Sequence, residues 1–175
     1  MNLRKYIITI VFSLTILGFN CTTKKGVDSN PGLIDTTTAK YGLDKLEDAQ
    51  HKWASKSTQN YQFKFQWMCE CDLKYVSPAW ITVKNDTIRS IYRQWLYCIA
   101  ESTVVETLAE SQFYQYKTID GLFDFLKTEL AKNPYAYSID YNEELGGYPS
   151  KAYIDYDKIM ADEEMTFNIF EVKIH

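Results

Sequence analysis

Residues 61–71 alternate between large apolar side chains and mostly polar ones, and this period of two constrains the fold more than any other feature of the chain. Successive side chains of a β-strand point to opposite faces of its sheet. Tyr61 and Phe63 therefore share one face, and Gln62 and Lys64 share the other. The pattern predicts a strand buried on one side, so a second layer must cover its apolar face.

Two amphipathic helices are predicted to supply that layer. Apolar residues recur at helical spacing over 43–53 and 118–130, where Thr118 is the expected N-cap of the second helix and Asn133-Pro134 its end. Residues 94–117 fit a short helix or strand edges. We expect an α+β fold with two helices packed on one face of a mainly antiparallel sheet of about six strands. Its further strands are 79–83, 87–92, 135–141, 151–156 and 165–174, with a hairpin turn at 84–86 and another turn at 145–149.

The order of a helix and three strands occurs twice along the chain. At an offset of 73 residues, Trp53 aligns with Leu126 and Trp80 with Tyr153. Two amphipathic helices and two sets of strands also share such a pattern by chance. The two interpretations are therefore a tandem helix-plus-three-strands repeat and a chance similarity.

The first 20 residues have the pattern of a secretory leader. Arg4 and Lys5 precede an apolar stretch at 6–19 that is too short to span a bilayer comfortably. The stretch ends Leu-Gly-Phe-Asn-Cys, which resembles the lipobox of bacterial lipoproteins, although Asn20 stands where a small residue is usual. We expect Cys21 to carry a lipid. Ordinary leader cleavage is the alternative, and a membrane-spanning helix is disfavoured against both.

The chain divides into three predicted segments. Residues 1–20 are the signal peptide, 21–40 are the anchor cysteine with a flexible tether rich in Thr, Lys, Gly and Ser, and 41–175 are a single α+β domain. The length of the part after the leader suits one domain with a hydrophobic core, and two independent domains are disfavoured. We expect an exported protein of the cell envelope, anchored in a membrane and facing the periplasm or the cell surface.

The charge of the chain disfavours one class of partner. Of 19 basic and 23 acidic residues, Arg4 and Lys5 lie in the leader, which leaves a net charge of −6 for the remainder. The sequence has no basic stripe that could follow a phosphate backbone. We therefore expect no nucleic-acid partner.

Three cysteines remain once Cys21 is assigned to a lipid. An exported protein meets an oxidising compartment, so a disulfide is expected between Cys98 and either Cys69 or Cys71. A direct bond between Cys69 and Cys71 would be strained, because both lie on one face of a strand. Since few histidines are available as a fourth ligand, we expect neither a metal nor another cofactor.

No familiar catalytic arrangement is present. The sequence has no persuasive Ser-His-Asp or Cys-His set and no glycine-rich phosphate loop. The arguable acids are Asp155 with Glu143 or Glu144, which would suit a carboxylate-dependent hydrolase or glycan-processing enzyme. Acids of this kind are abundant in any acidic domain, so no catalytic residue is assigned.

Several motifs resemble those of a family of uncharacterised bacterial secreted proteins and lipoproteins, a domain of unknown function. The similarity runs from about Leu46 to Val172, and no activity is implied by it. Asp86 departs from the pattern, because glycine is common at that turn position. The motifs are Tyr61 with the alternation after it, Cys69-Glu70-Cys71, Ile81-Thr82-Val83-Lys84-Asn85, Thr118-Ile119-Asp120-Gly121-Leu122-Phe123-Asp124, Tyr141, Gly147-Tyr148-Pro149 and Asp155.

The function that these observations favour is a non-enzymatic binding or accessory module for an envelope protein or a cell-wall polymer. Trp80 and Tyr153 are predicted to point away from the helices and to anchor the partner. The competing interpretation is that they pack against cross-strand neighbours or lie under residues 94–117. A ligand-carrying barrel is a third possibility, and it would require an unfilled apolar interior.

Overall fold

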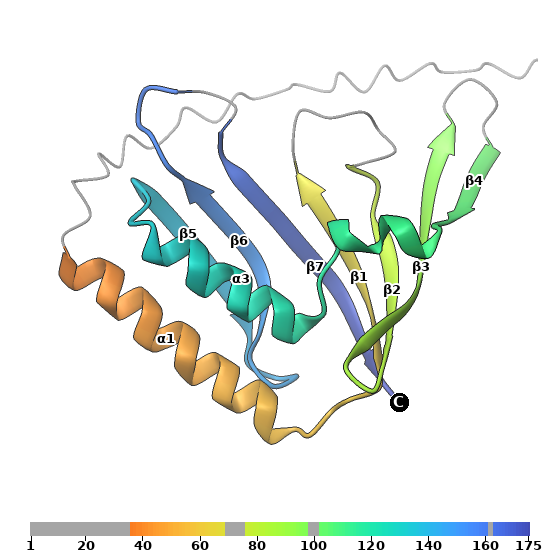
Figure 1. The fold of residues 1–175 in the computed structure, drawn as a ribbon, viewed down its shortest axis with the longest axis horizontal. Helices are drawn as coiled ribbons and strands as arrows, with labels where there is room; N and C mark the ends of the chain where they lie inside the picture. Colours follow the sequence, from red (N-terminus) through yellow and green to blue (C-terminus); the bar gives the residue numbers. More distant parts are fainter. Residues whose placement is uncertain (1–35, 69–75, 98–101, 161–162) are drawn as a thin grey trace, which may run out of the picture. The chain divides into compact units, whose positions relative to one another are not determined.

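The computed structural model describes residues 36–68, 76–97, 102–160 and 163–175 (Figure 1). In chain order the elements are α1 (Thr36–Ser55), β1 (Tyr61–Met68), β2 (Ala79–Lys84), β3 (Thr87–Tyr97), β4 (Ser102–Thr107), η1 (Glu110–Gln115), α3 (Ile119–Ala131), β5 (Ala136–Asn142), β6 (Tyr148–Asp155) and β7 (Met165–Ile174).

The seven described strands form one antiparallel sheet in the order β4-β3-β2-β1-β7-β6-β5. The α+β class and the antiparallel sheet are thus confirmed. The sheet has one strand more than the expected six, because the undetermined stretch 94–117 contains the end of β3, all of β4 and the short helix η1. The first strand, β1, pairs with the last, β7, at the middle of the sheet.

The helices end where the sequence predicts, but α1 begins earlier. Thr118 Oγ1 accepts a hydrogen bond from the backbone N–H of Gly121 at 3.0 Å and so caps α3. After α3, Asn133 adopts a φ of +57° immediately before Pro134. The start of α1 at Thr36 lies within the segment 21–40 that the sequence analysis assigns to a tether.

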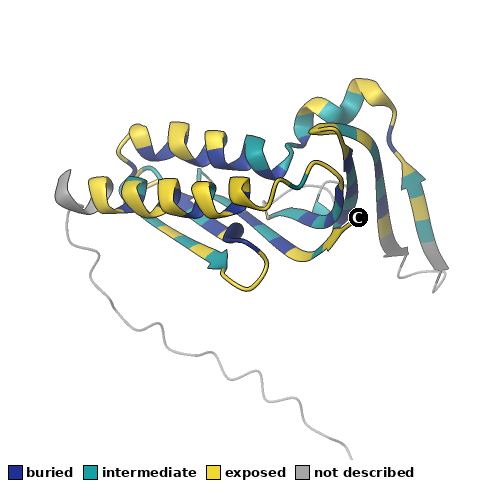
Figure 2. Cartoon of the chain, turned by 90° about the horizontal axis from the view of Figure 1, so that it is seen from below, coloured by how far each residue is buried: buried dark blue, intermediate teal, exposed yellow. Residues whose placement is uncertain are grey.

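The core lies between the sheet and the helices (Figure 2). On β1 the inward rings of Tyr61, Phe63, Phe65 and Trp67 follow one another with centroids 5.0–6.3 Å apart, as the alternation predicts. Leu46, Ala49 and Trp53 of α1 and Ile119, Leu122, Phe123, Leu126 and Leu130 of α3 are buried above the sheet. Among the described residues, no helix has both the length and the apolar character needed to cross a membrane.

Two turns fix the registers of the hairpins. Asn85 and Asp86 have φ values of +50° and +55°, the left-handed pair that a tight two-residue hairpin needs between β2 and β3. Between β5 and β6, Gly146 and Gly147 have positive φ values. The turn predicted at 145–149 extends too far along the chain, because β6 already begins at Tyr148, which is buried.

Candidate functional site

The sheet face opposite α1 and α3, called the open face from here on, has no described helix over it (Figure 2). Along β2, Ala79, Ile81 and Val83 are buried against the core, while Trp80 and Thr82 between them are only half-buried. The same alternation on β1 places Gln62, Lys64 and Gln66 on the open face. The open face therefore has the side chains that the sequence analysis predicts for β1 and β2.

Trp80 on the open face is held between two partners. Its ring stacks on that of its cross-strand neighbour Tyr92, with centroids 6.4 Å apart and planes 20° from parallel. The ammonium of Lys173 on β7 lies 4.4 Å from the centroid of the Trp80 ring and also pairs with Glu171 at 3.1 Å. Because β3 and β7 lie on opposite sides of β2, Tyr92 and Lys173 approach Trp80 from opposite sides.

Tyr153 lies on the open face but far from Trp80. It stands opposite Ser138 and Thr166, and its hydroxyl donates to Asp155 Oδ2 at 3.4 Å. Three strand spacings and about four residues along the strands separate Tyr153 from Trp80, which places them roughly 20 Å apart. The two predicted anchors share a face and do not form one patch.

Burial raises the pKa of the Tyr153 hydroxyl, and the Asp155 carboxylate raises it further. Both effects disfavour ionisation of Tyr153, which would place a second negative charge beside Asp155. Tyr153 is therefore a neutral hydrogen-bond donor at ordinary pH.

The open face carries a local excess of positive charge on one half. Its outward positions on β1, β2 and β7 include Lys64, Lys84 and Lys173 and a single acid, Glu171. On β5 and β6 the outward charges are Lys151, Asp140 and Asp155. A chain with an overall acidic charge thus concentrates lysines beside Trp80.

A depression of about 520 Å³ opens at the end of this lysine-bearing half. It is lined by Asn60, Thr82, Val83, Lys84 and His175. The backbone N–H of His175 donates to the Asn60 carbonyl at 3.1 Å, which fastens β7 to the loop before β1. Nearby, Gln62 Nε2 donates to Thr82 Oγ1 at 3.1 Å. The depression presents hydroxyl, amide and ammonium groups together.

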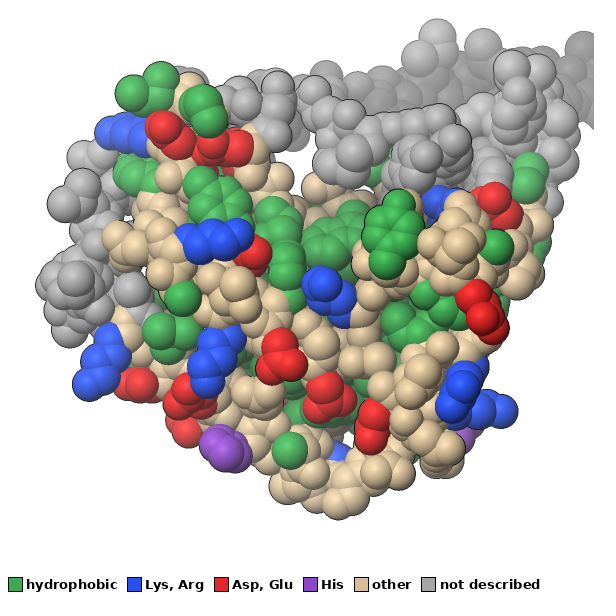
Figure 3. All heavy atoms as spheres, in the orientation of Figure 1, with side chains coloured by type: hydrophobic (Ala, Val, Ile, Leu, Met, Phe, Trp, Pro, Cys, Tyr) green, Lys and Arg blue, Asp and Glu red, His purple; other side chains and the backbone are tan. Residues whose placement is uncertain are grey.

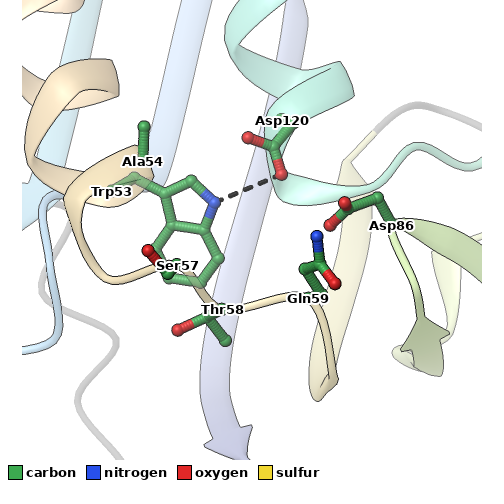
Figure 4. Close-up of a pocket in the computed structure, with 7 residues that line it drawn as sticks. All are labelled: Trp53, Ala54, Ser57, Thr58, Gln59, Asp86 and Asp120. Atoms are coloured by element: carbon green, nitrogen blue, oxygen red, sulfur yellow. Dashed lines mark hydrogen bonds between the residues drawn. The ribbon is translucent and has the colours of Figure 1, made fainter.

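A second pocket, of about 380 Å³, lies on the helix side of the sheet (Figure 4). It is lined by Trp53, Ala54, Ser57, Thr58, Gln59, Asp86 and Asp120. The indole Nε1 of Trp53 donates to Asp120 Oδ2 at 3.3 Å, and Gln59 and Asp86 lie across the pocket from Trp53 (Figure 4). Sequence reasoning did not identify this pocket, although Asp120 belongs to the Thr-Ile-Asp motif.

The polar groups beside this pocket stabilise the fold. Asp120 stands in the first turn of α3, where a carboxylate complements the helix dipole. The buried Tyr61 hydroxyl accepts the backbone N–H of Ile119 at 3.0 Å. Burial raises the pKa of Tyr61, and the charges of Asp120 and Asp86 act in the same direction. These contacts explain the presence of Asp120 beside the pocket, so no ligand is needed to explain it.

The carboxylates of the hydrolase interpretation are not brought together. Glu143 lies in the turn before β6 and binds Lys52 of α1 at 2.7 Å, and Glu144 follows it in that turn. Asp155 is the last residue of β6, so roughly 20 Å of strand separates it from Glu143 and Glu144. Glycosidase carboxylates are about 5 to 10 Å apart. The described residues therefore provide no support for this pair as a catalytic site.

A polar cluster joins the end of α3 to the end of β6. Glu129 has a side chain that is 9% exposed, and it accepts hydrogen bonds from Lys132 Nζ at 2.6 Å and from the Tyr156 hydroxyl. Burial acts to raise the pKa of Glu129, but the two hydrogen bonds and the Lys132 charge outweigh it and the pKa is lowered. Glu129 is thus a paired, ionised group inside the structure.

The predicted lipidation site and disulfide lie outside the described residues. This applies to Cys21, Cys69, Cys71 and Cys98. The strands that precede the cysteines are described. Both β1 and β3 run antiparallel to β2, so they run in the same direction. Within the described ranges, no three His, Cys, Asp or Glu side chains are grouped closely enough to hold a metal ion.

The described part of the chain has an α+β fold with a seven-stranded antiparallel sheet, which the described helices α1 and α3 cover on one face. Residues 45–174 match the model of a family of unknown function, DUF6174, and the chain belongs to that family. No curated protein and no solved structure matches the chain.

Proposed function

We propose that the chain is an exported, lipid-anchored envelope protein that binds a partner through its open face and performs no catalysis. The observation that carries this proposal is the arrangement around Trp80. A Trp held between Tyr92 and Lys173, on a sheet face without a described helix over it, is a rigid element of the kind that binding surfaces use. The separation of Glu143 from Asp155 removes the main support for an enzyme.

A co-sedimentation assay with isolated native envelopes tests the binding surface. The chain from residue 21, with Cys21→Ser to remove the lipid, is mixed with envelopes and pelleted. Reversing two open-face charges, Lys64→Glu with Lys173→Glu, is expected to leave the protein in the supernatant. The free energy of unfolding is measured in parallel to show that the variant is folded.

The matched control reverses two lysines on the helix-covered face, where acidic and basic side chains are mixed (Figure 3). Lys52 and Lys127 are both about half exposed, and each pairs with a single glutamate. Lys52→Glu with Lys127→Glu makes the same change in net charge and is expected to sediment like the parent chain. Equal loss of sedimentation in both double variants would contradict binding through the open face.

The lipid anchor has its own test. We expect the intact mass of the protein from its native host to show loss of residues 1–20 and addition of lipid at Cys21. Cys21→Ser is expected to abolish the added mass and to release the protein from the membrane fraction. A mass pattern that differs only by the substitution would remove the anchor from the proposal.

The sequence analysis left a tandem repeat of a helix and three strands as one interpretation of the fold, and the strand directions do not support it. The lateral order β3-β2-β1 is followed by β7-β6-β5, but every neighbouring pair in the sheet is antiparallel, so β5, β6 and β7 run opposite to their counterparts β1, β2 and β3. Matching positions share their burial: Ala79 and Ala152 are buried, as are Ile81 and Ile154, whereas Trp80 and Tyr153 face outward. The shared burial therefore reflects the alternation that is common to half-buried strands.

A further inference from the structure

We propose that the half of the open face formed by β3, β2, β1 and β7 binds an anionic polysaccharide, with Lys64, Lys84 and Lys173 as its charge contacts. The inference rests on the proposed binding function and names the chemical class of the partner.

The charges of this half of the open face are complementary to those of an anionic polymer. The three lysines lie on the adjacent strands β2, β1 and β7: Lys64 and Lys173 neighbour Trp80, and Lys84 lies four residues from it along β2. Glu171 is the one acid among the described outward positions of β1, β2 and β7. Glu171 is already paired with Lys173. Lys64 stands between Trp80 and Glu171 in the register, and Lys84 projects at the end of β2 beside the depression. A carboxylated or phosphorylated polymer would supply negative charges that complement this excess of lysines.

The neutral groups on the same surface suit hydroxyl-rich sugar units. Gln62 and Thr82 are already joined by a hydrogen bond and keep further donor and acceptor capacity. The 520 Å³ depression at the end of this half has a volume in the range of small-molecule sites. Trp80 adds one aromatic ring whose position is fixed by Tyr92 and Lys173.

Two other partners fit this surface less well. A protein interface has an apolar centre, whereas the described outward positions of β1 and β2 are polar between Gln62 and Gln66 and around Trp80. Binding to an anionic bilayer uses clusters of about four to eight basic residues, and the rest of this chain is acidic.

The direct test uses a defined probe, polygalacturonate, which is a linear carboxylated polysaccharide, and dextran as its uncharged counterpart. The chain from residue 21 with Cys21→Ser is titrated with each probe by calorimetry. We expect binding to polygalacturonate and not to dextran. Raising the salt from about 0.1 M to about 1 M shortens the screening length from about 10 Å to about 3 Å and should abolish the binding.

Single substitutions locate the site, because replacing a lysine should weaken polygalacturonate binding and replacing the acid should strengthen it. Lys64→Gln, Lys84→Gln and Lys173→Gln should each weaken polygalacturonate binding by about twofold to fivefold, the effect of one exposed ion pair. Glu171→Gln removes the opposing acid and should strengthen binding. Lys151→Gln is the matched control, because it removes the same charge from the same face in the half that also carries Asp140 and Asp155, and it should change nothing.

Each alternative result has a distinct meaning. Equal weakening by Lys151→Gln and Lys64→Gln, or equal binding of dextran, would overturn the proposed site or its charge chemistry. Binding to phosphatidylglycerol vesicles but not to polygalacturonate would identify a lipid surface and overturn the glycan. If no polysaccharide binds while envelope sedimentation still depends on Lys64 and Lys173, the binding function stands and the ligand class is wrong.

Discussion

The indole nitrogen of Trp53 donates a hydrogen bond across 3.3 Å to Asp120 and thereby joins α1 to the first turn of α3. We expect Asp120→Ala to lower the free energy of unfolding by about 1 to 2 kcal/mol, because it removes a charge-assisted hydrogen bond and a favourable charge at the helix N-terminus. Denaturant titration measures the loss. Asp124→Ala, one turn later and exposed, should change stability by less than about 0.5 kcal/mol. Equal losses in the two variants would contradict the role of the Trp53 contact.

Trp80 and Tyr153 should differ in their contribution to stability, although both face outward. Trp80→Ala removes the stack on Tyr92 and the contact with Lys173, and we expect a loss of about 1 to 2 kcal/mol. Tyr153→Ala removes one long hydrogen bond to Asp155 and should cost less. Thermal unfolding of the two variants compares them. A larger loss for Tyr153→Ala would show that the contacts of Trp80 have little energetic weight.

The Glu129 cluster should make stability depend on pH at the acidic end. The pKa of Glu129 in the folded protein is below its ordinary value, so its contribution is complete above the unfolded pKa of about 4.3 and disappears as the pH falls through the folded pKa. Glu129→Gln removes this titration, and we expect a shallower loss of unfolding free energy below about pH 5. A curve parallel to that of the parent chain would show that Glu129 is not the responsible group.

Tyr156→Phe tests the same cluster at neutral pH. It removes the hydroxyl that donates to Glu129 and leaves Lys132 as the remaining partner. We expect a loss of about 1 kcal/mol in the free energy of unfolding. Tyr114→Phe serves as the control, because the Tyr114 side chain is largely exposed. Indistinguishable stabilities of the two variants would rule out a stabilising hydrogen bond at Glu129.

The disulfide between Cys98 and either Cys69 or Cys71 stays a prediction. The strands that precede these residues, β1 and β3, run in the same direction on either side of β2, and the cysteines themselves lie outside the described residues. Closing a loop of about 30 residues should add about 2 to 4 kcal/mol to the stability of the oxidised protein. Peptide mapping without reductant identifies the pair, and three free thiols would refute it.

The elements that sequence reasoning located well are those with a regular apolar period. The alternation of β1 and the stripe of α3 correspond to buried rings and buried aliphatic side chains. Strand β4 was not resolved from the sequence, because the inward position of β3 opposite it is the buried Arg93, which pairs with Glu106 at 2.9 Å. An ion pair inside a sheet breaks the apolar alternation on which the prediction depends.

Of the candidate site, the sequence predicted only which side chains of the strands face outward. Alternation correctly places Trp80 and Tyr153 on one face. Their separation of roughly 20 Å depends on β1 pairing with β7, a contact between distant parts of the chain that no local pattern specifies. The same pairing brings Lys173 to Trp80, so the positive half of the open face was not visible in the sequence.

The pairing of β1 with β7 also has a consequence for how the chain acquires its structure. The last strand along the chain is placed in the middle of the sheet, with β1 on one side and β6 on the other. Until β7 is available, β1 and β6 each keep an unpaired edge that other chains could join. The complete sheet therefore forms late and through contacts of high sequence separation, which are slow to form. A chain made from its N-terminus onward cannot complete this sheet until residues 165–174 are available.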